Sequence, residues 1–453
     1  MKLVTSLWAL AAALPLSTLA AQDTCKLVES STKVQLYRRF ALAYTSEQNE
    51  YWSTACGALK PSCILYPKTT EEVSQIVSIL KGTGETFAIK SGGHNPNDYF
   101  SSVDGGPLIS TDKLNQVELD KKAGTVRVGP GNRWDDVLGA LDGTGFTAVG
   151  GRIGNVGVGG FLLGGGLSFL SAQYGWAANS VLEYEIVLAN GTAVTASKTQ
   201  NTDLFAALRG GGNNFGIVTS FLLQAYPQGQ IWGGTMVFTD STKKAAALLK
   251  AVRDFTEYCD DDKAALILTS VKVIGLVDVW VMFAFYDGPS PPDWVFANFT
   301  AVGTLTNTCK TQSYASLLSA NNVGVVKGSV YSIGTETMPL PSSQNEAEVM
   351  GAFHSHWRSV ASSVSLVPGV IANVAYQPFP KRMARIARAK GGDIMDMDDD
   401  VDRIIIELNY SYLLTLNRNK MDRAMVETYD GFRKLVQQFQ GKGSYRKRTC
   451  PCL

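Results

Sequence analysis

The sequence is poor in histidine and has almost no net charge. Only three of its 453 residues are histidines, and 41 Lys and Arg residues balance 40 Asp and Glu residues. Nucleic acids and anionic membrane surfaces attract basic stretches, and a balanced chain offers none of the required extent. The one basic cluster, Arg446-Lys447-Arg448, is too short to follow a phosphate backbone. We therefore expect neither nucleic acid nor a membrane as a partner.

Long apolar runs are absent after the N-terminal segment. That segment has Lys2, an apolar run from Leu3 to about Leu16, and small residues up to Ala21. The run is too short to span a bilayer, so it indicates a secretory signal peptide at residues 1–20. The sequence predicts an exported, soluble protein that acts in the secretory lumen or outside the cell.

Cysteine is also scarce, with seven residues in the whole chain. Export makes these cysteines candidates for disulfides rather than for metal ligands. Cys25, Cys56 and Cys63 lie close together in the sequence, so we expect a disulfide among these three. The spacing leaves open which two of them pair.

Export would also make glycosylation possible. Asn190, Asn298 and Asn409 each begin an Asn-x-Ser/Thr sequon and are predicted to carry glycans. Asn190 and Gly191 in addition predict a type I′ hairpin turn, a geometry that would leave this sequon unused.

The signatures of several common enzyme sites are missing. The chain contains no G-x-x-x-x-G-K-[ST] and no G-x-S-x-G motif. The sequence therefore gives no support for a phosphate-loop NTPase or a serine hydrolase. Residues 143–148, "GTGFTA", match the dinucleotide fingerprint, but they follow a predicted helix where the Rossmann fold requires a strand.

Metal-binding patterns also fail. Asp396, Asp398, Asp400 and Glu407 occupy four places of a calcium loop, but Val401 stands where the sharp turn requires glycine. His354 and His356 are two residues apart, with no Cys, Asp or Glu arranged around them. We predict no metal site.

The clearest local unit runs from residue 63 to residue 94. Its pattern predicts a strand at 64–66, a helix that a Thr69/Glu72 capping box begins and Gly82 ends, and a buried strand at 86–89. The unit delivers "KSGGH", Lys90 to His94, to the carboxyl end of a strand, where open α/β sheets bind ligands. Consecutive backbone N–H groups there predict an anion site, with Lys90 as a cation beside them.

Glycine gathers in the first half of the chain. Residues 150–166 include nine glycines among seventeen residues, and a second glycine loop at 210–212 precedes a predicted strand at 215–226. Val, Phe and Leu interrupt the glycines of residues 150–166, whereas flexible linkers are polar. This composition indicates backbone pressed against a flat or phosphorylated ligand.

The pattern changes after Pro227. Glycine thins out, and alternating strands at 277–288 and 403–414 share the region with amphipathic helices such as 243–258. We place a domain boundary at about 227–235, between a glycine-dense half and an antiparallel α+β half.

Three segments of the first half resemble the secreted FAD-linked oxidases of the berberine bridge enzyme-like group, in the vanillyl-alcohol oxidase/PCMH superfamily. "IKSGGHN" resembles the pyrophosphate loop with its flavin-linking histidine. Residues 150–181 resemble the flavin-contacting glycine segment, and "LRGGGNNFGIVTSF" resembles the third FAD motif.

The resemblance implies an α+β fold with two domains. A PCMH-type FAD-binding domain of two α/β subdomains would occupy residues 59–230, and an antiparallel-sheet substrate domain covered by helices would occupy 231–415. Residues 21–58 would form an N-terminal segment, and residues 416–453 a shortened C-terminal segment.

The resemblance also implies FAD as the cofactor, joined through the His94 imidazole to the 8α-methyl carbon of the flavin. Some relatives add a second link through a cysteine in G-G-x-C, and Ile153 at that place predicts one link only. The catalytic candidates are Tyr376 and Gln377, on a segment that resembles the strand lining the family's substrate cavity. The predicted cofactor-binding residues are Lys90, Ser91, Gly92, Gly93, His94, Gly151, Gly157, Gly159, Gly160, Gly164, Gly165, Gly175, Gly216 and Val218.

The implied function is hydride transfer from a small organic substrate, preferably a secondary metabolite, to FAD in a monomer, followed by reoxidation with O₂ to H₂O₂. A carbohydrate or alcohol oxidase of the same fold is the first alternative. Relatives end with a Tyr-x-Asn-Tyr strand and a Tyr-Asp-Pro element, whereas this chain ends in "TCPCL". A catalytically silent flavoprotein is therefore the second alternative.

Overall fold

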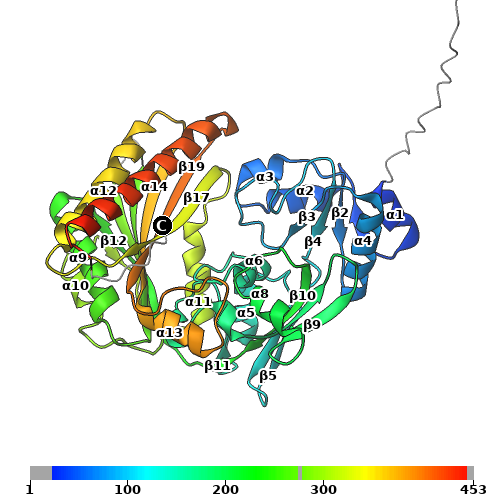
Figure 1. Cartoon of the computed structure of the whole chain (residues 1–453), viewed down its shortest axis with the longest axis horizontal. Helices are drawn as coiled ribbons and strands as arrows, with labels where there is room; N and C mark the ends of the chain where they lie inside the picture. The colour runs from blue at the N-terminus through cyan, green and yellow to red at the C-terminus, as the bar shows by residue number, and fades with distance from the viewer. Residues whose placement is uncertain (1–22, 274–277, 446–453) are drawn as a thin grey trace, which may run out of the picture.

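The computed structural model describes residues 23–273 and 278–445. The predicted signal peptide and the "TCPCL" end lie outside the described residues. Figure 1 shows two halves side by side, with the blue-to-green chain up to β10 on one side and a large sheet under helices on the other.

A four-stranded sheet opens the first half, with the strand order β1-β2-β4-β3. Strands β2, β4 and β3 run parallel, and helix α4 crosses between β2 and β3, as predicted. The helix ends at Gly84 rather than at Gly82, because Gly84 takes the left-handed conformation (φ 67°) that caps its last turn. The elements are α1 (Thr24–Ser31), β1 (Gln35–Tyr37), α2 (Leu42–Asn49), α3 (Thr54–Ala58), β2 (Cys63–Tyr66), α4 (Thr70–Thr83), β3 (Ala88–Lys90) and β4 (Pro107–Ser110).

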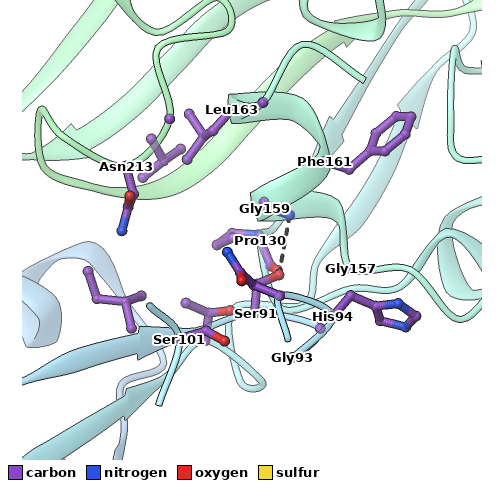
Figure 2. Close-up of a pocket in the computed structure, with 18 of the residues that line it drawn as sticks. Ser91, Gly93, His94, Ser101, Pro130, Gly157, Gly159, Phe161, Leu163 and Asn213 are labelled. Carbon is purple, nitrogen blue, oxygen red and sulfur yellow. Dashed lines mark hydrogen bonds between the residues drawn. The ribbon is translucent and has the colours of Figure 1, made fainter. Parts of the chain in front are cut away.

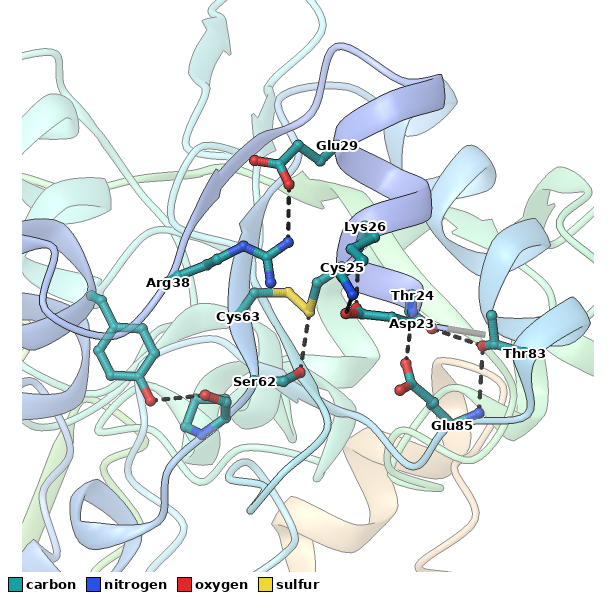
Figure 3. Close-up of a disulfide and its surroundings, with 12 residues drawn as sticks. Asp23, Thr24, Cys25, Lys26, Glu29, Arg38, Ser62, Cys63, Thr83 and Glu85 are labelled. Carbon is teal, nitrogen blue, oxygen red and sulfur yellow. Dashed lines mark hydrogen bonds and ion pairs between the residues drawn. A yellow bond between two sulfur atoms is a disulfide. The ribbon is translucent and has the colours of Figure 1, made fainter. Parts of the chain in front are cut away.

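A disulfide fixes the N-terminal helix to this sheet. Cys25 of α1 is bonded to Cys63 of β2, which resolves the pairing that the sequence left open (Figure 3). Cys56 is buried and carries a free thiol.

A five-stranded antiparallel sheet completes the first half, with the order β5-β6-β10-β8-β9. Its β8–β9 hairpin is not of type I′, because only Gly191 has a positive φ and the loop contains extra residues from Leu188 to Thr192. The elements are β5 (Val117–Asp120), β6 (Thr125–Val128), α5 (Trp134–Leu141), β7 (Phe146–Thr147), α6 (Val158–Leu163), α7 (Ser171–Tyr174), β8 (Val181–Val187), β9 (Ala193–Ser197), α8 (Thr202–Ala207), β10 (Ile217–Gln224) and β11 (Tyr226–Pro227).

The second half is built on a large antiparallel sheet, with the order β15-β12-β14-β13-β18-β19-β17 and β16 beside β12. Helices α9, α12 and α14 cover one of its faces (Figure 1). The elements are β12 (Ile231–Thr239), α9 (Thr242–Tyr258), β13 (Ala264–Val273), β14 (Val279–Tyr286), α10 (Ala297–Thr300), β15 (Thr306–Asn307), β16 (Lys310–Gln312), α11 (Tyr314–Asn321), β17 (Val330–Pro339), α12 (Glu346–Ser363), β18 (Ile371–Phe379), α13 (Lys381–Ala389), β19 (Arg403–Tyr412) and α14 (Arg418–Gly441).

The two faces of this sheet have different neighbours. Trp280 and Tyr376 point into the core that the sheet shares with α9, α12 and α14. Phe285 points the other way and stacks on Phe169 of the first half, with 5.1 Å between ring centroids. Because side chains alternate along a strand, every second residue of β13, β14, β18 and β19 faces the first half.

Within the described residues, no helix has the length and apolar character needed to cross a membrane. The same part of the chain contains no group of three or more His, Cys, Asp or Glu side chains that could hold a metal ion.

Candidate cofactor and active site

A cavity of about 400 Å³ lies in the first half, where the loop after β3 meets α6 and the start of β10. Figure 2 shows Ser91, Gly93 and His94 on one side of it, Gly157, Gly159 and Phe161 on a second side, and Asn213 across from them. Residues that had not been predicted also line it, namely Ile89, Asn95, Phe100, Ser101, Thr111, Pro130, Val156, Phe161, Leu163, Gly212, Asn213, Ile217 and Phe221.

The loop Ser91–His94 presents backbone donors to this cavity. Among the described residues, none accepts a hydrogen bond from the N–H groups of Gly92, Gly93 or His94. Ser91 holds the loop in place, because its Oγ donates to the Pro130 carbonyl (2.6 Å) and accepts from the Gly159 N–H (3.3 Å). Free N–H groups at a cavity wall form a binding site for an anion such as a pyrophosphate.

Two glycines of the cavity wall, Gly92 and Gly157, pack against each other. A Cβ on Gly157 would lie 2.3 Å from the Gly92 nitrogen, and a Cβ on Gly92 would lie 2.5 Å from the Gly157 Cα. By contrast, a Cβ on Gly160 would meet no atom within 4 Å, and Gly160 lines the cavity. The first two glycines therefore allow close chain contact, and Gly160 leaves room for a ligand.

Lys90 does not serve as the predicted cation of the anion site. Its Nζ lies 2.7 Å from a Glu47 carboxylate oxygen, and both side chains are buried. Ser110 donates to the same carboxylate at 2.8 Å. A buried ammonium needs such a partner, so Lys90 stabilises the base of the loop.

The His94 imidazole is held in one orientation at the edge of the loop. Its Nε2 lies 3.0 Å from Asn155 Oδ1, and the ring stacks on Trp52 with 5.6 Å between centroids. Arg133 also donates to Asn155 Oδ1 at 3.3 Å, which identifies this atom as the carbonyl oxygen, because Arg has no acceptor. His94 Nε2 therefore carries the hydrogen, and Nδ1 keeps a free electron pair.

Burial keeps this imidazole neutral. Loss of solvation lowers the pKa of His94 to about 4, against an ordinary value of 6.5, and the neighbouring Arg133 acts in the same direction. A neutral ring with one free nitrogen is a nucleophile at neutral pH.

The other predicted cofactor-binding residues divide into two groups. Gly159, Gly160, Gly164, Gly216 and Val218 line the cavity. Gly151, Gly165 and Gly175 lie outside its lining, and their Cα atoms face side chains of Trp134, Met395 and Asn179, respectively. Gly165 and Gly175 also have positive φ angles, which L side chains rarely adopt.

A polar cluster lies between the two halves. Arg152, from the glycine segment, donates to the Gln377 side-chain oxygen of β18, and Gln377 Nε2 donates to Glu407 Oε2 of β19 at 3.2 Å. Burial raises the pKa of Glu407, although Arg152 and Gln377 oppose the shift. A carboxylate with a raised pKa at a domain junction suits a general base.

Sequence reasoning did not identify Glu407, since it appeared there only as the last place of a rejected calcium loop. The available signal was the polar alternation of Glu407, Asn409 and Ser411 along one face of β19.

The two catalytic candidates point to opposite faces of β18. Gln377 faces the first half, whereas Tyr376 is fully buried on the helix side, 3.3 Å from Nδ1 of His354 on α12. The sheet itself separates Tyr376 from the first half, which contradicts its prediction as a catalytic residue. Alternation along the strand allows only one of two neighbours to reach a given side.

The predicted glycan at Asn409 conflicts with the structure. Asn409 lies on the face of β19 that is turned toward the first half, and its side-chain oxygen is buried. A glycan at this position would have to lie between the two halves. Asn190 and Asn298 lie on exposed turns or helices, and their modification stays a prediction.

Together these features define a class of protein. Free N–H donors fit a pyrophosphate, the open side of Gly160 fits a ligand packed on backbone, and a neutral nucleophilic imidazole stands at the cavity edge. Such a site fits a flavin dinucleotide.

Comparison with known proteins supports this assignment. The family described as "FAD binding domain" matches residues 61–197. An FAD-linked oxidoreductase of Arthroderma benhamiae, named as uncharacterized, is 43% identical over 410 residues, which cover 90% of this chain and 81% of that protein. The FAD-dependent monooxygenase FUP4 of Fusarium proliferatum is 32% identical over 79% of this chain and 70% of its own. This chain belongs to the family of FAD-linked oxidoreductases and is an FAD-dependent enzyme.

Solved structures show the same fold. Berberine bridge enzyme from Eschscholzia californica superimposes with a TM-score of 0.72 at 19% identity, over 95% of this chain and 86% of that chain. The 6-hydroxy-D-nicotine oxidase of Arthrobacter nicotinovorans gives 0.73 at 19% identity, over 89% and 86%. The predicted α+β architecture is confirmed.

Proposed function

We propose that this enzyme oxidises a small organic molecule of secondary metabolism and passes the electrons to O₂, releasing H₂O₂. The observation that carries the proposal is the arrangement of the interface. The neutral His94 stands at the edge of the cofactor cavity, and Gln377 and Glu407 face the same half from the large sheet. When bound, FAD supplies the hydride acceptor and the route to O₂.

His94 is the covalent anchor in this proposal. Its Nδ1 would hold the flavin through a bond to the 8α-methyl carbon; the methyl group and Nε2 would each give up one hydrogen, and O₂ would accept the two electrons. The Asn155 contact supports this role, because it holds the hydrogen on Nε2 and leaves Nδ1 free. A linked imidazole withdraws electron density and so favours oxidation of demanding C–H bonds.

Glu407 removes the substrate proton in this proposal. Its raised pKa gives the carboxylate more affinity for a proton than an exposed Glu has. Gln377 orients the carboxylate through its hydrogen bond at 3.2 Å, and Arg152 fixes Gln377 from the other side. Gln377 and Arg152 are positioning residues.

The names of relatives support a setting in secondary metabolism. The bifunctional solanapyrone synthase of Alternaria solani is 39% identical over 250 residues, which cover 55% of this chain and 48% of that protein. Other relatives are named FAD-dependent monooxygenases. Release of H₂O₂ in equal amount to product separates an oxidase from a monooxygenase, which would place one oxygen atom in its product.

Secretion is part of the same proposal. The Cys25–Cys63 disulfide supports it, because disulfides persist in oxidising compartments.

An absorbance spectrum before and after acid precipitation tests the anchor. We expect the wild-type pellet to keep its yellow colour and the His94→Ala pellet to lose it, because only a covalent bond survives denaturation. His356→Ala is the matched control, since His356 lies on α12 and is not part of the cavity lining. Flavin retained in the His94→Ala pellet, or absent from the wild-type pellet, contradicts the link. Anaerobic mixing with candidate substrates then tests oxidation through bleaching of the flavin.

A further inference from the structure

Two carboxamides lie side by side on the face of the large sheet that is turned toward the first half. Asn373 of β18 and Asn409 of β19 are direct partners across the strand pair. Both side chains are half-buried, and among the described residues neither carboxamide oxygen has a hydrogen-bond partner. Buried amide oxygens without partners are uncommon, because their desolvation costs free energy that a hydrogen bond normally offsets.

This pair stands in one line with the proposed base. Glu407 is two residues before Asn409 on β19, and its partner across the strands is Ala375, whose small side chain leaves space. Two residues of an extended strand span roughly 7 Å. A molecule that touches both the carboxamides and Glu407 therefore spans about the width of a fused ring pair.

Aliphatic side chains flank the carboxamides on both sides. On the same face, Val271 of β13 is the neighbour of Asn373, and Ile333 of β17 is the neighbour of Asn409. Val279 continues the row on β14, opposite Val271. All three aliphatic residues are partly exposed, so this face offers one polar spot within an apolar surround.

We infer that Asn373 and Asn409 determine substrate specificity by binding a hydroxyl group of a largely apolar, ring-containing substrate. A hydroxyl both donates and accepts, which matches two carboxamides that each offer an oxygen and an N–H₂ group. The hydroxyl lies roughly 7 Å from the hydrogen that Glu407 removes. The inference rests on the proposed function, because it takes this face to be the substrate side of the site.

The same row argues against sugars. A sugar has a hydroxyl on nearly every carbon, and Val271, Val279 and Ile333 offer none of them a partner. Burying unpaired hydroxyls against aliphatic side chains is unfavourable, and a site built for one hydroxyl discriminates strongly for it.

Equilibrium dialysis of the flavin-loaded protein tests the inference with two probes of one shape. 2-Naphthol has the hydroxyl, and 2-methylnaphthalene has a methyl group in its place. We expect the wild type to prefer 2-naphthol, and Asn373→Leu and Asn409→Leu each to lower this preference by roughly 3- to 10-fold, the worth of one hydrogen bond. Cellobiose, the sugar probe, should bind more weakly than either.

Thr337→Val is the control, because Thr337 of β17 pairs with Ile405, two rows away from the carboxamides on the same face. It should leave the preference unchanged. Asn373→Thr and Asn409→Thr place a hydroxyl where the wild type has a carboxamide, and they should keep part of the preference. They replace the Leu variants if thermal unfolding shows that the Leu variants do not fold. An unchanged preference in both Asn variants, no binding of either naphthalene, or tighter binding of cellobiose overturns the inference.

Dialysis requires no turnover, so the two proposals fail separately. A protein that binds 2-naphthol through the pair, yet never reduces its flavin with any substrate, keeps this inference and loses the oxidase. If a substrate instead reduces the flavin and binds equally well to the wild type and to both Asn variants, that result supports the proposed oxidase function and contradicts this inference.

Discussion

In the His94 imidazole, Nε2 forms a hydrogen bond with Asn155, and Nδ1 keeps a free electron pair. Asn155 and Arg133 produce this state, and neither residue belonged to the motif that drew attention to His94. The motif places a histidine at the loop, and the neighbours decide which nitrogen can react.

Asn155 should control the formation of the flavin link. Asn155→Leu removes the acceptor for Nε2–H, and we expect slower covalent incorporation of FAD into apoprotein, followed as acid-stable flavin over time. Asn155→Asp should also slow it near neutral pH, because a carboxylate favours the imidazolium form, in which both nitrogens are protonated. Raising the pH should restore the Asp variant but not the Leu variant. Equal pH dependence in both would assign Asn155 a purely structural role.

Protonation of Glu407 should cause the rate of flavin reduction to decrease at low pH. The carboxylate is the active form, so flavin reduction in anaerobic stopped-flow should slow as the pH falls through a pKa above the ordinary 4.5 of Glu. Glu407→Gln should lower this rate about 10²- to 10⁴-fold and remove the decrease at low pH. Glu336→Gln is the matched control, because burial also raises the pKa of Glu336, which pairs with Arg433 of α14. A Glu407→Gln enzyme with the wild-type profile would show that another group is the base.

At the scale of elements, amphipathic patterns were the reliable guide. The four apolar residues that predicted α5, Trp134, Val137, Leu138 and Leu141, are all buried. Element ends were harder, since the chain offers both Gly82 and Gly84 as a stop for α4. The last helical hydrogen bond runs from Gly84 N–H to the Leu80 carbonyl, and this bond selects Gly84.

Glycine-rich segments combine two kinds of requirement that composition cannot separate. Gly157→Ala should lower the free energy of unfolding by about 1–3 kcal/mol, because its Cβ meets the backbone of Gly92. Gly160→Leu should leave the stability of the apoprotein near the wild-type value and reduce FAD content at least tenfold, because its side chain enters the cavity. Urea unfolding and flavin absorbance measure the two effects. Normal FAD content in Gly160→Leu would place the cofactor elsewhere.

At the scale of the whole molecule, the two halves contact each other, and the proposed active site draws residues from both. Contacts between them include Arg152 with Gln377, the stacking of Trp52 on Tyr331 at 4.0 Å, and the ion pair of Asp98 with Arg418. The predicted cofactor motifs all come from the first half, whereas Glu407, Asn373 and Asn409 come from the second.

The stability of the flavin-loaded protein should depend on pH through His354. Burial lowers the pKa of His354 to about 4, so between pH 6.5 and 4 the unfolded chain binds a proton that the folded chain excludes. As the pH decreases from 6.5 to 4, the free energy of unfolding should therefore decrease by up to about 3 kcal/mol. His354→Gln should reduce the slope in urea unfolding. Tyr376→Phe should keep it, because burial rather than the hydrogen bond is the main cause, and a slope unchanged in His354→Gln would contradict the assignment.

The sequence by itself determined the family, the cofactor, the position of the candidate anchor His94 and most helices and strands, because these depend on local patterns and contiguous motifs. Only the tertiary structure decided which side of β18 and β19 faces the cofactor half. Both faces of these strands are covered, one by helices and one by the first half. The pattern of apolar residues in the sequence therefore does not show which face is turned toward the first half. For the same reason the sequence predicted both Tyr376 and Gln377 as catalytic candidates and a glycan at Asn409. It also gave no indication that Glu407 faces the first half.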